Sequence, residues 1–141
     1  MELYTCSWKG YELSTDFSKL QFDRIHDYLT QSYWSPGISR EDVQRAAMHS
    51  LSFGLYKENI QLGYARVVSD FTRFAYLADV YVEKTEQGNG LGKWLLKSIL
   101  AHPELQNVGR WMLLTQDAHA LYQKFDFREV SKPEMVMERV L

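Results

Sequence analysis

Hydrophobic positions recur with a helical period in two segments near the start of the chain. The first, about residues 18–31, carries apolar residues three or four positions apart, namely Phe22, Ile25 and Leu29. This spacing places them on one face of a helix. The segment SYWSPG, residues 32–37, interrupts the pattern with a proline and a glycine. Ser39 then stands three residues before Asp42, a spacing typical of helix starts, so a short second helix is predicted there.

The middle of the chain changes to a strand-like pattern. Three segments rich in β-branched and aromatic residues, 50–56, 60–69 and 74–82, are separated by short polar links. They predict three consecutive antiparallel strands. Residues 1–14 mix aromatic and polar residues in a way that is compatible with an edge strand.

The last third of the chain alternates between the two patterns. Residues 91–101 predict a helix that Pro103 ends, and RWMLLT, residues 110–115, predicts a buried strand. A short helix with Asp117 as its N-cap follows, and EMVMERVL, residues 134–141, is expected to close the sheet as a last strand. The order of elements predicts one α/β domain over residues 1–141, with a mixed, mostly antiparallel sheet and helices on both faces.

Composition narrows the classes of partner. Apolar residues make up 45% of the 141 residues and charged residues 24%, and the formal net charge is -2. This charge gives no overall attraction to nucleic acid or to anionic lipid, so a small molecule or a specific protein is the expected partner. With one cysteine, Cys6, and no zinc-type spacing, neither a disulfide framework nor a metal site is expected. Without a signal-like or membrane-length apolar segment, the expected location is cytoplasmic.

A glycine-rich segment carries the clearest functional signal. In EQGNGLGKWLL, residues 86–96, three glycines lead into the helix predicted from residue 91, whose first turn carries Lys93. Glycine turns at helix starts expose backbone N–H groups, which suit a phosphate, and a bound phosphate would stabilise the lysine there. The alternative is a plain glycine cap. The spacing G-x-G-x-G differs from both the dinucleotide fingerprint and the nucleotide P-loop.

Two motifs resemble the GCN5-related N-acetyltransferase (GNAT) superfamily. Gln87, Gly90 and Gly92 match its pattern Q/R-x-x-G-x-G/A after a strand, and AHALYQKFDF, residues 118–127, matches a second signature through Ala118 and Tyr122. The predicted order of elements is also that of the family. The resemblance covers nearly the whole chain and implies acetyl-CoA as the co-substrate.

The resemblance also implies which residues hold acetyl-CoA. The pyrophosphate would lie on the glycine turn, and the pantetheine arm would pair with the end of the preceding strand, where it diverges from RWMLLT. The implied cofactor-binding residues are Val80, Tyr81, Val82, Gln87, Gly88, Asn89, Gly90, Leu91, Gly92 and Lys93. Thr115 stands where many members have an asparagine that touches the pantetheine. Asp126 replaces a common glycine, at a cost of roughly 1 kcal/mol if its backbone is left-handed.

Acetyl transfer to an amine needs a neutral nucleophile, a stabilised oxyanion and a proton for the thiolate. Tyr122 matches the family's tyrosine that protonates the thiolate. Asp79 is the acidic residue of the strand before the glycine turn and is the candidate base. A β-bulge in this strand would change the face to which Asp79 points. A hydrogen bond between Asp79 and a neighbouring loop is therefore an equal alternative to the role of base. In that case, ordered water would take the proton from the amine.

The acceptor is expected over the loop 32–37, where Tyr33 and Trp34 can form an aromatic wall for an amine, or simply anchor the loop. Trp8, Arg66 and Phe74 are further candidates for the pocket lining. The function expected is direct N-acetylation of a primary amine on a small molecule. The alternatives are a non-catalytic acyl-CoA-binding module and an acetyltransferase for protein N-termini or lysines. A homodimer that uses the apolar residues of segment 134–141 is also expected.

Overall fold

One six-stranded sheet organises the chain in the computed structural model, which describes all 141 residues. The strands follow their order in the sequence: β1 (Thr5–Trp8), β2 (Tyr11–Ser14), β3 (Leu51–Lys57), β4 (Ile60–Ser69), β5 (Ala75–Val82) and β6 (Trp111–Leu113). Neighbouring strands are antiparallel except β5 and β6, which are parallel. The mixed, mostly antiparallel sheet expected from the sequence is confirmed.

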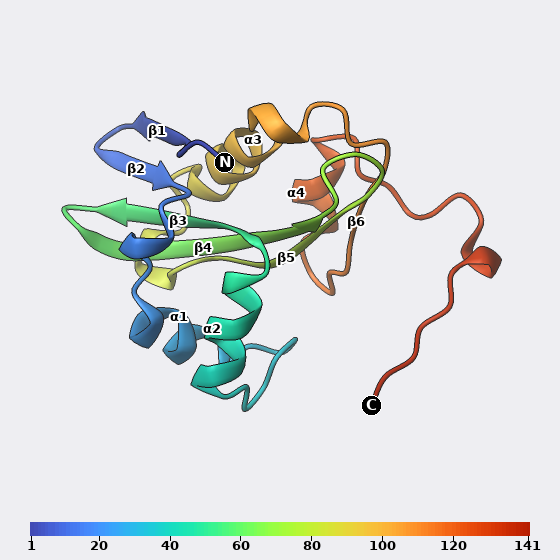
Figure 1. Cartoon of the computed structure of the whole chain (residues 1–141), viewed down its shortest axis with the longest axis horizontal. Helices are drawn as coiled ribbons and strands as arrows, with labels where there is room; N and C mark the ends of the chain where they lie inside the picture. Colours follow the sequence, from blue (N-terminus) through green and yellow to red (C-terminus); the bar gives the residue numbers. More distant parts are fainter.

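Helices cover both faces of this sheet (Figure 1). On one face lie α1 (Phe22–Leu29) and α2 (Arg40–Met48), and on the other lie α3 (Leu91–Leu100) and α4 (His119–Gln123). Each face has its own apolar core, and β5 contributes buried side chains to both. Leu77 packs in the core with α3 and α4, whereas Tyr81 packs in the core with α1 and α2. No helix has the length and apolar character needed to span a bilayer.

The N-terminal third differs from the expectation in two ways. The predicted single edge strand over residues 1–14 is a hairpin of β1 and β2, whose turn residues Lys9 and Gly10 both have positive φ. A two-residue turn of this kind matches the twist of paired strands. The first helix is shorter than residues 18–31, because Gln21 leaves helical geometry and exchanges hydrogen bonds with Gln61 of β4. The second helix begins as predicted, with Ser39 accepting from the N–H of Asp42.

The C-terminal region contains the larger corrections. The strand predicted at 134–141 is wrong, since a 3₁₀ turn at Pro133–Met135 is followed by exposed residues with no strand pairing. Figure 1 shows this tail running away from the sheet. Strand β6 is half-buried and shorter than the predicted segment 110–115. Asp117 is not the N-cap of α4, which begins after Ala118 without a side-chain cap.

Candidate functional site

The site begins where β5 and β6 part. The two strands pair over three residues only, with Ala75, Tyr76 and Leu77 opposite Trp111, Met112 and Leu113. Beyond Leu77, β5 continues to Val82 alongside β4, while the chain after β6 turns away at the exposed Leu114. The β6 side of residues 78–82 therefore lacks a strand partner. An extended ligand can add to such an edge as a further strand would.

A β-bulge in β5 decides which way Asp79 points. Tyr81 pairs with Tyr64 of β4 and Ala78 pairs with Arg66, so that two residues of β5 lie opposite one of β4. Asp79 takes a left-handed conformation there (φ 54°), which aspartate tolerates better than most residues. Strict alternation would place Asp79 on the same face as Leu77. The bulge turns it instead to the opposite face, toward the loop between α1 and α2.

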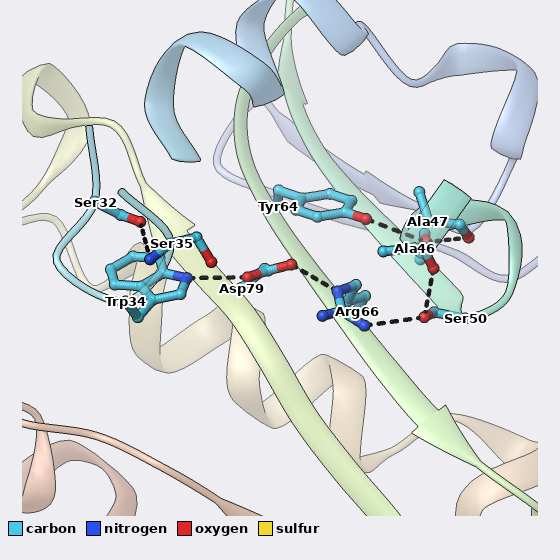
Figure 2. A network of polar contacts seen from close by, with 10 residues as sticks. Ser32, Trp34, Ser35, Ala46, Ala47, Ser50, Tyr64, Arg66 and Asp79 are labelled. Atoms are coloured by element: carbon cyan, nitrogen blue, oxygen red, sulfur yellow. Dashed lines mark hydrogen bonds and ion pairs between the residues drawn. The ribbon is translucent and has the colours of Figure 1, made fainter. Parts of the chain in front are cut away.

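Both carboxylate oxygens of Asp79 are engaged (Figure 2). Oδ2 accepts from Nε of Arg66 at 2.6 Å, and Oδ1 accepts from Nε1 of Trp34 at 2.9 Å. Arg66 in turn donates to the hydroxyl of Ser50, which bonds the C-terminal end of α2 through the carbonyl of Ala46. The Asp79 side chain is only 9% exposed. This network ties the α1–α2 loop to the sheet. Asp79 thus makes the bond to a neighbouring loop that was the alternative to its role as the base.

A cavity of about 260 Å³ lies between the α1–α2 loop, the parted strands and α4. Tyr33 and Trp34 line it, as expected for an acceptor wall, and their rings meet edge to face. Tyr33 also has an anchoring role, because its hydroxyl accepts from the N–H of Gln116 at 2.9 Å. The pair therefore holds together the two sides of the cavity. Of the three further candidates, Arg66 lines this cavity, whereas Trp8 stacks on Trp94 and Phe74 lies outside.

Tyr122 reaches the same cavity from α4. Its ring is buried against the core and packs edge to face on Phe127. Its hydroxyl makes no hydrogen bond within the chain, which leaves it free to donate to a ligand. Burial, with smaller contributions from Tyr33 and Asp117, raises the pKa of Tyr122 to about 12. The hydroxyl therefore keeps its proton at neutral pH, as a proton donor must.

The glycine turn leads from β5 into α3. Gly88 and Gly90 have φ of 87° and 80°, values that favour glycine, and Gly90 is the N-cap of α3 without a side-chain cap. Backbone N–H groups from residue 88 to residue 93 donate to no acceptor in the chain. The first turn of α3 holds no acidic residue, and Lys93 is exposed there. Unpaired amides at a positive helix end form an anion-binding site.

Two of the predicted cofactor-binding residues also form hydrogen bonds within the chain. Nε2 of Gln87 donates to the carbonyl of Val82 at 2.8 Å, which fixes the turn to the end of β5. The hydroxyl of Thr115 accepts from the N–H of Ala118 at 3.1 Å and so shapes the approach to α4. Thr115 also lines the cavity. Asp126 has the left-handed conformation expected of a glycine replacement (φ 68°).

Asp117 is a residue whose position the sequence reasoning missed. It lines the cavity beside Tyr122, and its carboxylate takes part in no hydrogen bond or salt bridge. Its place just before the predicted short helix suggested an N-cap, which is a common role for an aspartate there. The cavity thus contains one paired carboxylate, Asp79, and one free carboxylate, Asp117.

Comparison with known proteins agrees with this geometry. The model of the Acetyltransferase (GNAT) family matches residues 11–127. A protein of the fungus Gibberella zeae named "Putative acetyltransferase FG08082" is 31% identical and covers 84% of this chain and 81% of its own. A GNAT-family crystal structure from Xanthomonas campestris pv. campestris, described as a "putative acetyltransferase", is 40% identical, covers 96% of both chains and has a TM-score of 0.92. A GNAT acetyltransferase from Elizabethkingia anophelis with acetyl-CoA bound has a TM-score of 0.68 at 15% identity, covering 95% of this chain and 90% of its own, and so shares the fold.

The anchoring role of Asp79 predicts a large loss of stability when its charge is removed. Asn keeps the left-handed conformation but leaves the half-buried Arg66 without a counter-ion, so Asp79→Asn should lower the free energy of unfolding by about 3 kcal/mol. The matched control is Asp23→Asn, which breaks a mostly exposed pair with Arg40 and should cost less than about 1 kcal/mol. Urea unfolding of both variants measures the difference. Equal, small losses would contradict the anchoring role.

Proposed function

Because the chain belongs to the GNAT family of acetyltransferases, we propose that it transfers the acetyl group of acetyl-CoA directly to a primary amine on a small molecule. The observation that carries this proposal is that three features lie next to one another: the glycine turn, the free edge of β5 and the cavity. The glycine turn with its unpaired amides comes one 3₁₀ turn (Lys84–Glu86) after the free edge of β5, and that edge borders the cavity holding the Tyr122 hydroxyl.

The residues present fit acetyl-CoA, which would supply the acetyl group as a reactive thioester. Its phosphates suit the amides of residues 88–93, with Lys93 as a nearby cation. Its amide-containing pantetheine arm suits the free edge of Val80, Tyr81 and Val82, where backbone hydrogen bonds can form as in a sheet. Such an arm would end beside the cavity. These contacts support the cofactor-binding residues inferred from the resemblance.

The chemical step requires a new C–N bond and the loss of the C–S bond. A backbone N–H of the parted β5 edge can stabilise negative charge on the carbonyl oxygen. Tyr122 can donate its proton as the thiolate leaves, because its pKa, raised to about 12, keeps it protonated. Asp79 was the candidate base, but its oxygens are occupied by Arg66 and Trp34. We therefore give Asp79 a positioning role and let water carry the proton from the amine.

The walls of the cavity favour a small cationic acceptor. The free carboxylate of Asp117 can attract an ammonium group, and the aromatic ring of Trp34, held in place by Asp79, can lie beside it. The volume of about 260 Å³ lies below that of typical drug-sized pockets. These features support a small amine over a protein N-terminus or a lysine in a protein.

Binding of acetyl-CoA predicts a difference between two glycines of the turn. Gly90→Val places a branched side chain on a left-handed backbone beside the amides, so acetyl-CoA affinity should fall at least about tenfold. Gly92→Ala is the matched control, because its added Cβ meets only Leu121, at 4.0 Å, and affinity should change less than about threefold. Calorimetry on folded proteins measures both. Unchanged affinity in Gly90→Val would contradict phosphate binding at this turn.

The acid role of Tyr122 predicts a loss of turnover without a loss of binding. Tyr122→Phe keeps the ring against Phe127 and removes only the hydroxyl, so turnover should fall by about a hundredfold to ten-thousandfold while acetyl-CoA affinity changes little. The assay is CoA release across a panel of small amines and peptides. Because the pKa of Tyr122 is raised to about 12, loss of its proton should not lower wild-type turnover at pH values well below 12.

The control for Tyr122→Phe is Tyr56→Phe. Tyr56 is also buried, and its hydroxyl has no partner, but it lies outside the cavity. Removal of this hydroxyl should leave turnover unchanged. If Tyr122→Phe turns over as fast as the wild type when chemistry limits the rate, Tyr122 is a packing residue only. If no amine in the panel stimulates CoA release by the wild type, the proposed acetylation of small amines is wrong.

A further inference from the structure

One wall of the 260 Å³ cavity holds two hydrogen-bond donors that the chain itself does not use. Arg66 of β4 engages Asp79 through Nε and Ser50 through Nη1, but its Nη2 donates to no group in the chain. Figure 2 shows this third guanidinium nitrogen without a dashed line. The hydroxyl of Tyr76 on β5 also takes part in no hydrogen bond, and neither donor is sealed from solvent.

Strand pairing brings the two donors together. Arg66 lies opposite Ala78 and Val68 lies opposite Tyr76, so Arg66 and Tyr76 are diagonal neighbours on one face of the sheet. Long side chains in such positions are within reach of each other. Burial raises the pKa of Tyr76, and the nearby charge of Arg66 acts against this rise. A guanidinium and a hydroxyl side by side can donate to the two oxygens of one carboxylate.

The free carboxylate of the cavity stands on a different wall. Asp117 comes from the loop that precedes α4, whereas Arg66 comes from β4. Asp117 also lies close to the proposed acid, since its charge is a cause of the raised pKa of Tyr122, after burial and Tyr33. An ammonium group drawn to Asp117 would therefore arrive beside the reacting atoms, and the rest of the acceptor would extend toward Arg66.

We propose that the acceptor is a small amino acid, whose carboxylate binds Nη2 of Arg66 and the hydroxyl of Tyr76 while its amine lies beside Asp117. This inference deepens the proposed function and rests on it. A simple amine would leave both donors without an acceptor once the ligand excludes water, and a site of this kind rejects a ligand that lacks the matching group. Asp79 already balances the charge of Arg66, so the carboxylate gains charge-assisted hydrogen bonds and not a full ion pair.

The transfer itself keeps the balance given above. The amine nitrogen of the amino acid forms the new C–N bond, the C–S bond breaks, water takes the proton from the amine, and the thiolate takes the proton of Tyr122. The product is an N-acetylated amino acid, which keeps the carboxylate but has no cationic amine. It therefore loses its attraction to Asp117, which favours its release.

Three matched pairs of acceptors test the inference on the unaltered protein. Each pair keeps the amine and replaces the carboxylate by a methyl group: glycine with ethylamine, β-alanine with propylamine, and 4-aminobutyrate with butylamine. In at least one pair, kcat/KM measured by CoA release should be at least about tenfold higher for the amino acid. An amino acid no better than its amine in all three pairs would overturn the inference and leave acetylation of small amines standing. No turnover of any acceptor would contradict the proposed function as well.

Substitution of the two donors identifies the groups that bind the carboxylate. Arg66→Lys keeps a cation for Asp79 but removes the guanidinium fork, so the ratio of kcat/KM for the amino acid to that for its matched amine should fall by about tenfold. Tyr76→Phe should lower this ratio less, and it tests the site with the ion pair intact if Arg66→Lys does not fold. Both acceptors are measured with the same variant, so a general loss of stability cancels in the ratio.

The matched control is Arg24→Lys. Arg24 pairs with Glu83 and lies outside the cavity, so this variant should keep the wild-type ratio. An undiminished ratio in both Arg66→Lys and Tyr76→Phe, or an equal fall in Arg24→Lys, would overturn the assignment of the carboxylate to these donors.

Discussion

The parting of β5 and β6 after three residues is the constraint on which the rest of the site depends. A strand inside a sheet normally has both edges paired, and here one edge of residues 78–82 is left open. The glycine turn begins where this edge ends, and the cavity lies where it begins. One break in strand pairing therefore aligns a turn of unpaired amides, an open strand edge and the hydroxyl of the buried Tyr122. This alignment suits a long ligand that carries phosphates at one end and a reactive group at the other.

The bulge at Asp79 adapts the same strand to a second task. Upstream of the bulge, β5 packs Leu77 against α3, and the bulge resets the alternation so that Asp79 faces the α1–α2 loop. The carboxylate then holds Trp34 and Arg66, whose positions define one wall of the cavity. The Asp79–Arg66 pair is largely shielded from water, so removal of one partner would leave the other as an unpaired charge. This wall of the cavity therefore depends on the pair. Strand geometry thus sets both the open edge and the acceptor side.

Between the first helix and α4 the sequence predicted the order of elements, and it also predicted the Ser39 cap and the glycine turn, because each depends on local spacing. What it could not predict depends on contacts between distant residues. The direction of Asp79 follows from a bulge that strand alternation does not show. Its pairing with Arg66 joins two strands, and the lining role of Asp117 depends on a turn held by Thr115. The tail has the composition of a strand, but a strand also needs a paired edge, and residues 136–141 pair with no strand of the sheet.

Amide hydrogen exchange with and without acetyl-CoA tests most directly whether the open edge and the turn act as one binding site. If they do, acetyl-CoA should slow exchange in two separate stretches at once, the amides of residues 88–93 and those of the β5 edge at residues 80–82. Exchange in α2, which lies on the other face of the sheet, should not change. Protection of the glycine turn without the β5 edge, or of neither stretch while acetyl-CoA is bound, would contradict the account.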